Sequence, residues 1–112
     1  MAETKHYLYR IQPTRPAMLT EGLTTEERAI MTEHFSYLQR LTEQGVMILV
    51  GRTQTTGEDS MGIAIFNASS DEEARAIMNN DPAVKQHVMS AKIFPYRIAL
   101  LSEANAHMPP DE

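Results

Sequence analysis

Residues 24–50, TTEERAIMTEHFSYLQRLTEQGVMILV, contain the pattern of a complete helix followed directly by a buried strand. Thr24 and Glu27 have the spacing of a capping box, in which each side chain accepts a hydrogen bond from the other residue's backbone N–H. Gly45 is a typical helix end, since glycine adopts the left-handed conformation found there without steric cost. We therefore predict a helix from Thr24 to about Gln44, and a strand over the apolar run Val46–Val50.

Similar signals on both sides of this segment complete a β-α-β-β-α-β order, which is typical of an α+β, ferredoxin-like fold with both helices on one face of an antiparallel sheet. The expected sheet order is 4-1-3-2, which places the last strand, with Pro95, at an edge where proline is tolerated. The other predicted elements are a strand at His6–Ile11, a loop at Pro13–Gly22, a hairpin or longer loop at Thr53–Ser60, a strand at Met61–Phe66, a helix from Ser70 to about Met78, a short helix near Ala83–His87 and a strand at Ala91–Leu101.

Length and composition limit the function classes. A chain of 112 residues suffices for one domain, which we assign to residues 1–101, with a flexible C-terminal tail at 102–112. The absence of cysteine fits a reducing compartment, and no apolar run approaches the roughly 20 residues of a membrane span, so we expect a cytoplasmic protein without a membrane partner. The net charge is -5 and the ten Lys and Arg residues are scattered, which argues against a nucleic-acid partner.

Apolar residues occupy both faces of the second and third predicted strands, although two helices can cover only one face of the sheet. The sets expected to face opposite ways are Val46, Ile48 and Val50 against Met47 and Leu49, and Ile63 and Ile65 against Ala64 and Phe66. An uncovered apolar face of this size predicts a homodimer or a higher homo-oligomer. The alternative is that the tail or the Pro13–Gly22 loop covers that face.

His34 lies inside the apolar stripe of the long helix, which places its imidazole toward the sheet. By itself it can be a core histidine whose ring bonds a backbone carbonyl, and Asp81 by itself can be the N-cap of a short helix that begins at Pro82. Because both helices pack on the same face, the carboxylate could instead reach the imidazole and fix its tautomer, as in a general base. We find no glycine-rich phosphate loop and no His-x-x-x-His metal motif.

The chain resembles the YciI-like (YCII-related) domain family from about Tyr7 to Leu101. The resemblance rests on segments whose order and spacing are specific together: Glu33–Leu41 (EHFSYLQRL), Gly45–Gly51 (GVMILVG), Asp71–Ala74 (DEEA), Asp81–Val84 (DPAV) and Pro95–Arg97 (PYR). It implies a dimeric α+β barrel, and an active-site histidine and aspartate that map onto His34 and Asp81. The family is similar to muconolactone isomerases and includes dehydrochlorinase-type lyases. Arg52 departs from the proline that many relatives carry after the second glycine.

The leading functional hypothesis is a small enzyme, without a metal or organic cofactor, that performs lyase or isomerase proton transfer on a small organic acid or lactone. His34 would be the base or acid and Asp81 would orient it. Further candidates for binding the substrate are Arg10, Arg15, Tyr37 and Arg52. The alternative is a non-catalytic small-molecule-binding or accessory dimeric domain, and a heme-degrading or quinol-type monooxygenase rests on fold analogy alone.

Overall fold

A computed structural model of the chain describes residues 4–107. Its four strands, β1 (Lys5–Pro13), β2 (Met47–Arg52), β3 (Gly62–Ala68) and β4 (Met89–Tyr96), form one antiparallel sheet in the order β2-β3-β1-β4. This is the predicted order, and it confirms the ferredoxin-like α+β fold. The two outer strands are β2 and β4, so Pro95 lies on an edge strand as expected.

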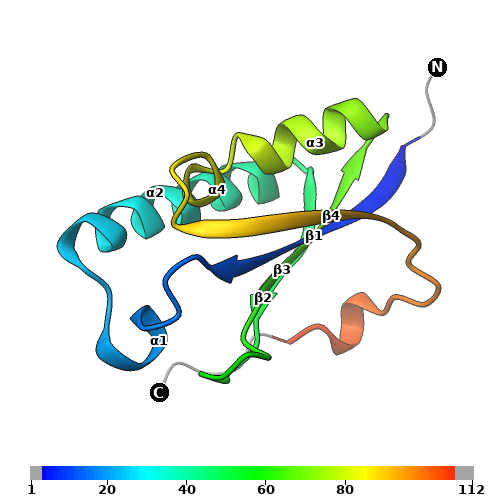
Figure 1. The fold of residues 1–112 in the computed structure, drawn as a ribbon. Helices are drawn as coiled ribbons and strands as arrows, with labels where there is room; N and C mark the ends of the chain where they lie inside the picture. The colour runs from blue at the N-terminus through cyan, green and yellow to red at the C-terminus, as the bar shows by residue number, and fades with distance from the viewer. Residues whose placement is uncertain (1–3, 108–112) are drawn as a thin grey trace.

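The long helix and the two helices that follow it in the chain lie together on one side of the sheet (Figure 1). The long helix α2 (Thr25–Glu43) is followed in the chain by α3 (Asp71–Asn79) and the short α4 (Pro82–Lys85). The capping box of α2 is confirmed: the Glu27 N–H donates to Thr24 Oγ1 at 3.0 Å, and the Thr24 N–H donates to Glu27 Oε1 at 2.9 Å. Such a cap stabilises a helix by about 1 kcal/mol.

The main core fills the space between the sheet and these helices. Tyr7 and Tyr9 of β1 point toward the helices, and the ring of Tyr9 packs edge-on against Phe66 of β3 with centroids 5.6 Å apart. Both Tyr9 and Phe66 are fully buried. A second, smaller core at the end of the sheet contains Met18, Ile30 and Val88.

Two predictions of local structure were wrong. The segment Pro13–Gly22 is not only a loop, since it contains a four-residue helix α1 (Met18–Glu21) that begins without a side-chain cap. The last strand ends at Tyr96 rather than Leu101, and its last pair with β1, His6–Tyr96, lies one residue from the start of β1 at Lys5. Residues beyond it include a single 3₁₀ turn, Glu103–Asn105, and the part of the predicted tail after residue 107 lies outside the described residues.

The alternation predicted for the second strand was also wrong, because β2 contains a bulge between Met47 and Leu49. The extra residue places both Met47 and Val50 opposite helix-facing residues of β3, and Leu49 opposite Ile65 on the other face. The alternation predicted for β3 is confirmed by its burial pattern.

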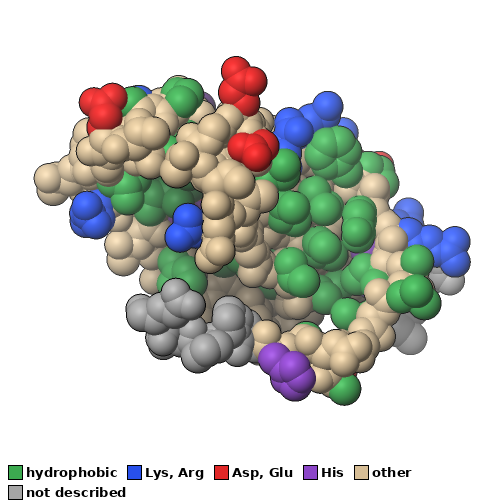
Figure 2. Space-filling view, turned by 90° about the horizontal axis from the view of Figure 1, so that it is seen from below, with side chains coloured by type: hydrophobic (Ala, Val, Ile, Leu, Met, Phe, Trp, Pro, Cys, Tyr) green, Lys and Arg blue, Asp and Glu red, His purple; other side chains and the backbone are tan. Residues whose placement is uncertain are grey.

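The sheet face away from the helices carries an apolar surface. Figure 2 views the molecule from below Figure 1, on the side opposite the helices, and shows hydrophobic side chains gathered there. Leu49 on this side is 52% exposed, and Leu100 and Leu101, in the segment after β4, are also exposed. The homodimer therefore remains a prediction that this surface supports. No helix within residues 4–107 is long and apolar enough to cross a membrane.

Candidate active site

His34 and Asp81 meet between the helices and the sheet, although 47 positions separate them in the chain. His34 lies mid-way along α2, and Asp81 is the N-cap of α4, where its Oδ1 accepts the Ala83 N–H at 3.0 Å. The imidazole Nδ1 is 2.7 Å from the same Oδ1. The structure therefore unites the two roles that the sequence left as alternatives for Asp81, a helix cap and a partner of the imidazole.

The Asp81 carboxylate is completely buried and fully hydrogen-bonded. Its second oxygen, Oδ2, accepts a hydrogen bond from the Tyr9 hydroxyl at 2.7 Å. Burial and the negative charge of Asp81 raise the pKa of Tyr9 far above its usual value, so this hydroxyl stays a neutral donor. A buried carboxylate would be costly without such partners.

These contacts decide which ring nitrogen of His34 is available. A backbone amide and a tyrosine hydroxyl already donate to Asp81, and a carboxylate accepts hydrogen bonds, so we assign the imidazole proton to Nδ1. Nε2 then carries a lone pair. The side chain of His34 is 12% exposed.

His34 lines a cavity of about 390 Å³ between α2 and the end of the sheet nearest α1. This volume lies within the usual range for small-molecule sites. The cavity wall is formed mainly by apolar side chains from the sheet and from α1 and α2, among them Ile11, Leu19, Met31, Leu38, Ala64 and Met89. Its polar members besides His34 are the Tyr9 hydroxyl, Arg52, and three hydroxyl side chains of the β2–β3 connection, Thr53, Thr55 and Ser60.

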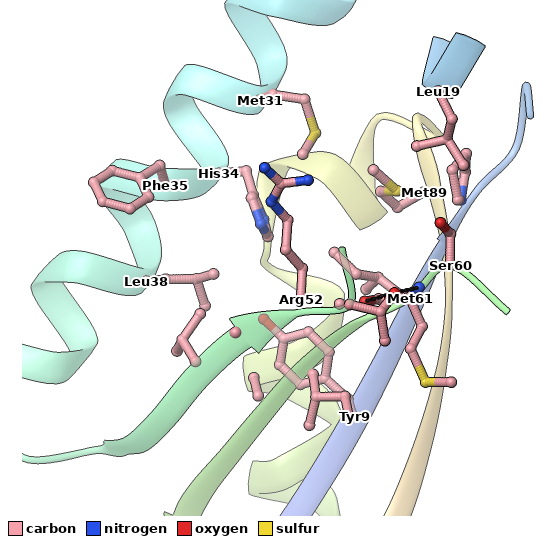
Figure 3. A pocket seen from close by; sticks show the side chains of 18 of the residues that line it. Tyr9, Leu19, Met31, His34, Phe35, Leu38, Arg52, Ser60, Met61 and Met89 are labelled. Carbon is pink, nitrogen blue, oxygen red and sulfur yellow. Dashed lines mark hydrogen bonds between the residues drawn. The ribbon is translucent and has the colours of Figure 1, made fainter. Parts of the chain in front are cut away.

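Figure 3 shows how the polar side chains of this cavity are arranged. His34 projects down from α2, and Arg52 projects up from the end of β2 toward the same space. Arg52 was predicted to bind substrate, and the structure brings it to the same cavity as His34. Ser60, on the far side of the sheet end, is buried and donates its hydroxyl to the Thr55 carbonyl.

The other three candidates for substrate binding lie away from this cavity. The Tyr37 hydroxyl donates to the Ile77 carbonyl at 2.6 Å, which joins α2 to α3, and burial raises the pKa of Tyr37 to about 12. Arg15 donates two hydrogen bonds to Glu27 at the start of α2. Arg10 alternates with the helix-facing Tyr9 and so lies on the open face of the sheet.

Two groups at the site were missed by the sequence reasoning. Tyr9 could have been placed on the helix-facing side of β1 by its alternation with the neighbouring buried residues, but its contact with Asp81 depends on where α4 begins. Leu19 reaches the cavity from α1, a helix whose start has no capping signal. No three His, Cys, Asp or Glu side chains gather as a metal site in the part of the chain that the structure describes.

A model of the YCII-related domain matches residues 7–97. The chain belongs to this family. The match includes His34, Asp81, Tyr9 and Arg52, so the whole site lies within the family domain. No curated protein sequence matches the chain significantly.

Two solved structures show the same fold at low sequence identity. The 5-chloro-2-hydroxyhydroquinone dehydrochlorinase of Burkholderia phenoliruptrix, solved in complex with 2,5-dihydroxybenzoquinone, is similar with a TM-score of 0.58 and 17% identity, over 81% of this chain and 93% of that one. An uncharacterized protein of Thermotoga maritima is similar with a TM-score of 0.54 and 11% identity, over 85% of this chain and 100% of that one. At these identities the likeness establishes the fold.

Proposed function

We propose that this YCII-related protein is a small enzyme in which His34 transfers a proton next to a carbonyl group of a small organic acid or lactone. One observation carries the proposal: an imidazole held at Nδ1 by a buried carboxylate lines an apolar cavity large enough for a single-ring molecule. The carboxylate fixes the tautomer and stabilises the imidazolium that forms when Nε2 takes a proton.

The proton transfer follows from this arrangement. Nε2 takes a proton from the carbon adjacent to the carbonyl, and the C–H electron pair moves to the carbonyl to form an enolate. In an isomerase step the imidazolium returns the proton to another carbon. In a lyase step the enolate electrons expel a leaving group from the neighbouring carbon, and the imidazolium gives its proton to solvent. Arg52 is the proposed substrate-binding residue. Arg10, Arg15 and Tyr37 do not line the cavity, and Arg15 and Tyr37 are hydrogen-bonded to other parts of the chain.

The test compares the turnover of the unmodified protein with that of His34→Ala and Asp81→Asn on a panel of lactones and chlorinated hydroxyquinones. The similar fold of a dehydrochlorinase guides the second half of the panel. We expect His34→Ala to lower kcat/KM by at least about 100-fold, because general acid–base catalysis contributes about that much. Asp81→Asn should lower it as well, since an amide neither fixes the same tautomer nor balances the imidazolium charge.

Two control variants match these changes. His107→Ala removes an exposed histidine, and Asp71→Asn alters a helix-start aspartate that accepts a tyrosine hydroxyl in the same way, without contacting His34. Both controls should keep full turnover. Equal turnover in the unmodified protein and in folded His34→Ala would refute the catalytic role.

The low exposure of His34 favours one alternative, a domain that binds a small molecule without chemistry. In that case the ring of His34 is a hydrogen-bond partner of the bound molecule. Ligand binding that His34→Ala weakens, in a protein that turns over no member of the panel, would support this alternative over catalysis.

A further inference from the structure

Among residues 4–107, Arg52 is the only Lys, Arg, Asp or Glu that lines the cavity. It also makes no ion pair within 4.0 Å with any carboxylate of residues 4–107. Arg15, by contrast, forms an ion pair with Glu27 at 2.6 Å. An arginine that forms no ion pair within this part of the chain, next to an apolar cavity, keeps its planar set of donors available for a ligand.

The position of Arg52 is set by the strand rather than by a mobile loop. Arg52 pairs with Gly62 and is two residues from Val50, so both side chains leave β2 on the helix-facing side. The connection after it is closed by two hydrogen bonds of 2.9 Å between Thr53 and Met61. Gly62, which pairs with Arg52, also lines the cavity, and the Ile11 side chain packs directly over it.

From this arrangement we infer that Arg52 selects ring-sized organic anions, binding their carboxylate while the apolar wall holds the ring. A guanidinium binds a carboxylate through two parallel hydrogen bonds, which orients as well as attracts it. The protein as a whole carries a net charge of -5, so its overall field does not favour anions. The local guanidinium acts within a few ångströms, where salt screens it little.

If the proposed function holds, a carboxylate bound by Arg52 would also place the reacting carbon of the substrate near His34; this part of the inference rests on the proposed function. The preference for a carboxylate over a neutral analogue rests on the cavity and Arg52 alone, so binding can test it without turnover.

The experiment measures the binding of benzoate and of benzamide by calorimetry or by backbone amide chemical shifts. The two probes share one ring and nearly one shape, and only benzoate is charged. Arg52→Gln should weaken benzoate binding by about 10- to 100-fold, the usual effect of losing a hydrogen bond to a charged group, and should change benzamide binding by less than about 2-fold. Arg52→Lys, which keeps the charge and loses the planar fork, should fall between Arg52→Gln and the unmodified protein.

Arg75→Gln is the matched control, because Arg75 is exposed on α3 and does not line the cavity. An unmodified protein that binds neither probe, or binds both equally, would overturn the inference, as would equal losses for benzoate in the two glutamine variants. Benzoate binding that depends on Arg52 but persists in His34→Ala, without turnover of any substrate, would keep the inference and refute the catalytic proposal. Turnover that needs His34, in a protein that does not prefer benzoate to benzamide, would keep the catalytic proposal and refute the inference about Arg52.

Discussion

Replacing Tyr9 by Phe removes one hydrogen bond from the buried network and leaves the ring in place. The hydroxyl donates to Asp81 Oδ2 at 2.7 Å, and both side chains are essentially inaccessible to water. Water therefore cannot replace the lost donor, and the carboxylate oxygen remains without its partner. A hydrogen bond to a charged group is worth about 1.5–3 kcal/mol, so we expect a loss of about that size in the free energy of unfolding.

This loss translates into a measurable shift in Tm. The entropy of unfolding is about 2.1 cal/mol/K per residue, or about 0.24 kcal/mol/K for 112 residues. Tyr9→Phe should therefore lower Tm by about 6–12 °C in thermal unfolding followed by circular dichroism. Tyr7→Phe is the matched control, because the Tyr7 hydroxyl also donates to a helix-start aspartate, at 2.6 Å, but that residue, Asp71, is exposed and can bind water instead.

We expect Tyr7→Phe to cost less than about 1 kcal/mol, near the low end for a hydrogen bond that solvent can replace. Equal losses in the two variants, or an unchanged Tm for Tyr9→Phe, would refute the claim that burial of the Asp81 network makes it strongly stabilising.

Three other predictions concern the surroundings of the site. The hydrogen bonds from Arg15 lower the pKa of Glu27 from 4.5 to about 2. The Glu27 carboxylate therefore stabilises the fold above its unfolded pKa, and this contribution is lost as the pH falls toward 2. In Arg15→Gln, the midpoint of the Glu27 titration followed by NMR should move back up. Gly62→Ala would place a Cβ 2.9 Å from Ile11 Cγ1, so denaturant unfolding should show a loss of about 1–3 kcal/mol, and a neutral result would mean that the cavity wall yields easily. If a homodimer forms on the open face, Ile65→Asp should convert it to a monomer by light scattering, whereas a monomeric unmodified protein would contradict the predicted interface.

The sequence predicted the features that depend on local chemistry. The capping box at Thr24, the glycine that ends α2 and the Asp-Pro start of α4 each require only neighbouring residues, and each is present in the structure. The inward orientation of His34 followed from helical periodicity and is also confirmed by its contact with Asp81. These signals gave the order of elements and singled out His34 and Asp81, and the family resemblance added the proposal that the two form an active-site pair.

The features that the sequence did not predict depend on partners distant in the chain. The bulge in β2 changes which apolar residues face the helices, and it is visible only in the pairing with β3. The last strand ends near the start of β1, at the His6–Tyr96 pair, although residues 98–101 beyond it are apolar. Arg52 and His34 face one cavity only because β2 ends beneath α2 at that point, which no short motif encodes.

Asp81 links the stability of this fold to the geometry of its site. The same carboxylate caps α4, accepts the Tyr9 hydroxyl from the sheet and holds the imidazole of α2, so three elements depend on it. A change at Asp81 must therefore alter stability and His34 together, and its kinetic effect alone cannot separate the two. Tyr9→Phe perturbs the carboxylate from the sheet side, whereas His34→Ala leaves both the cap and the tyrosine contact intact. If catalysis is the function, His34→Ala should lose activity with a modest change in Tm, and Tyr9→Phe should lose more stability than activity.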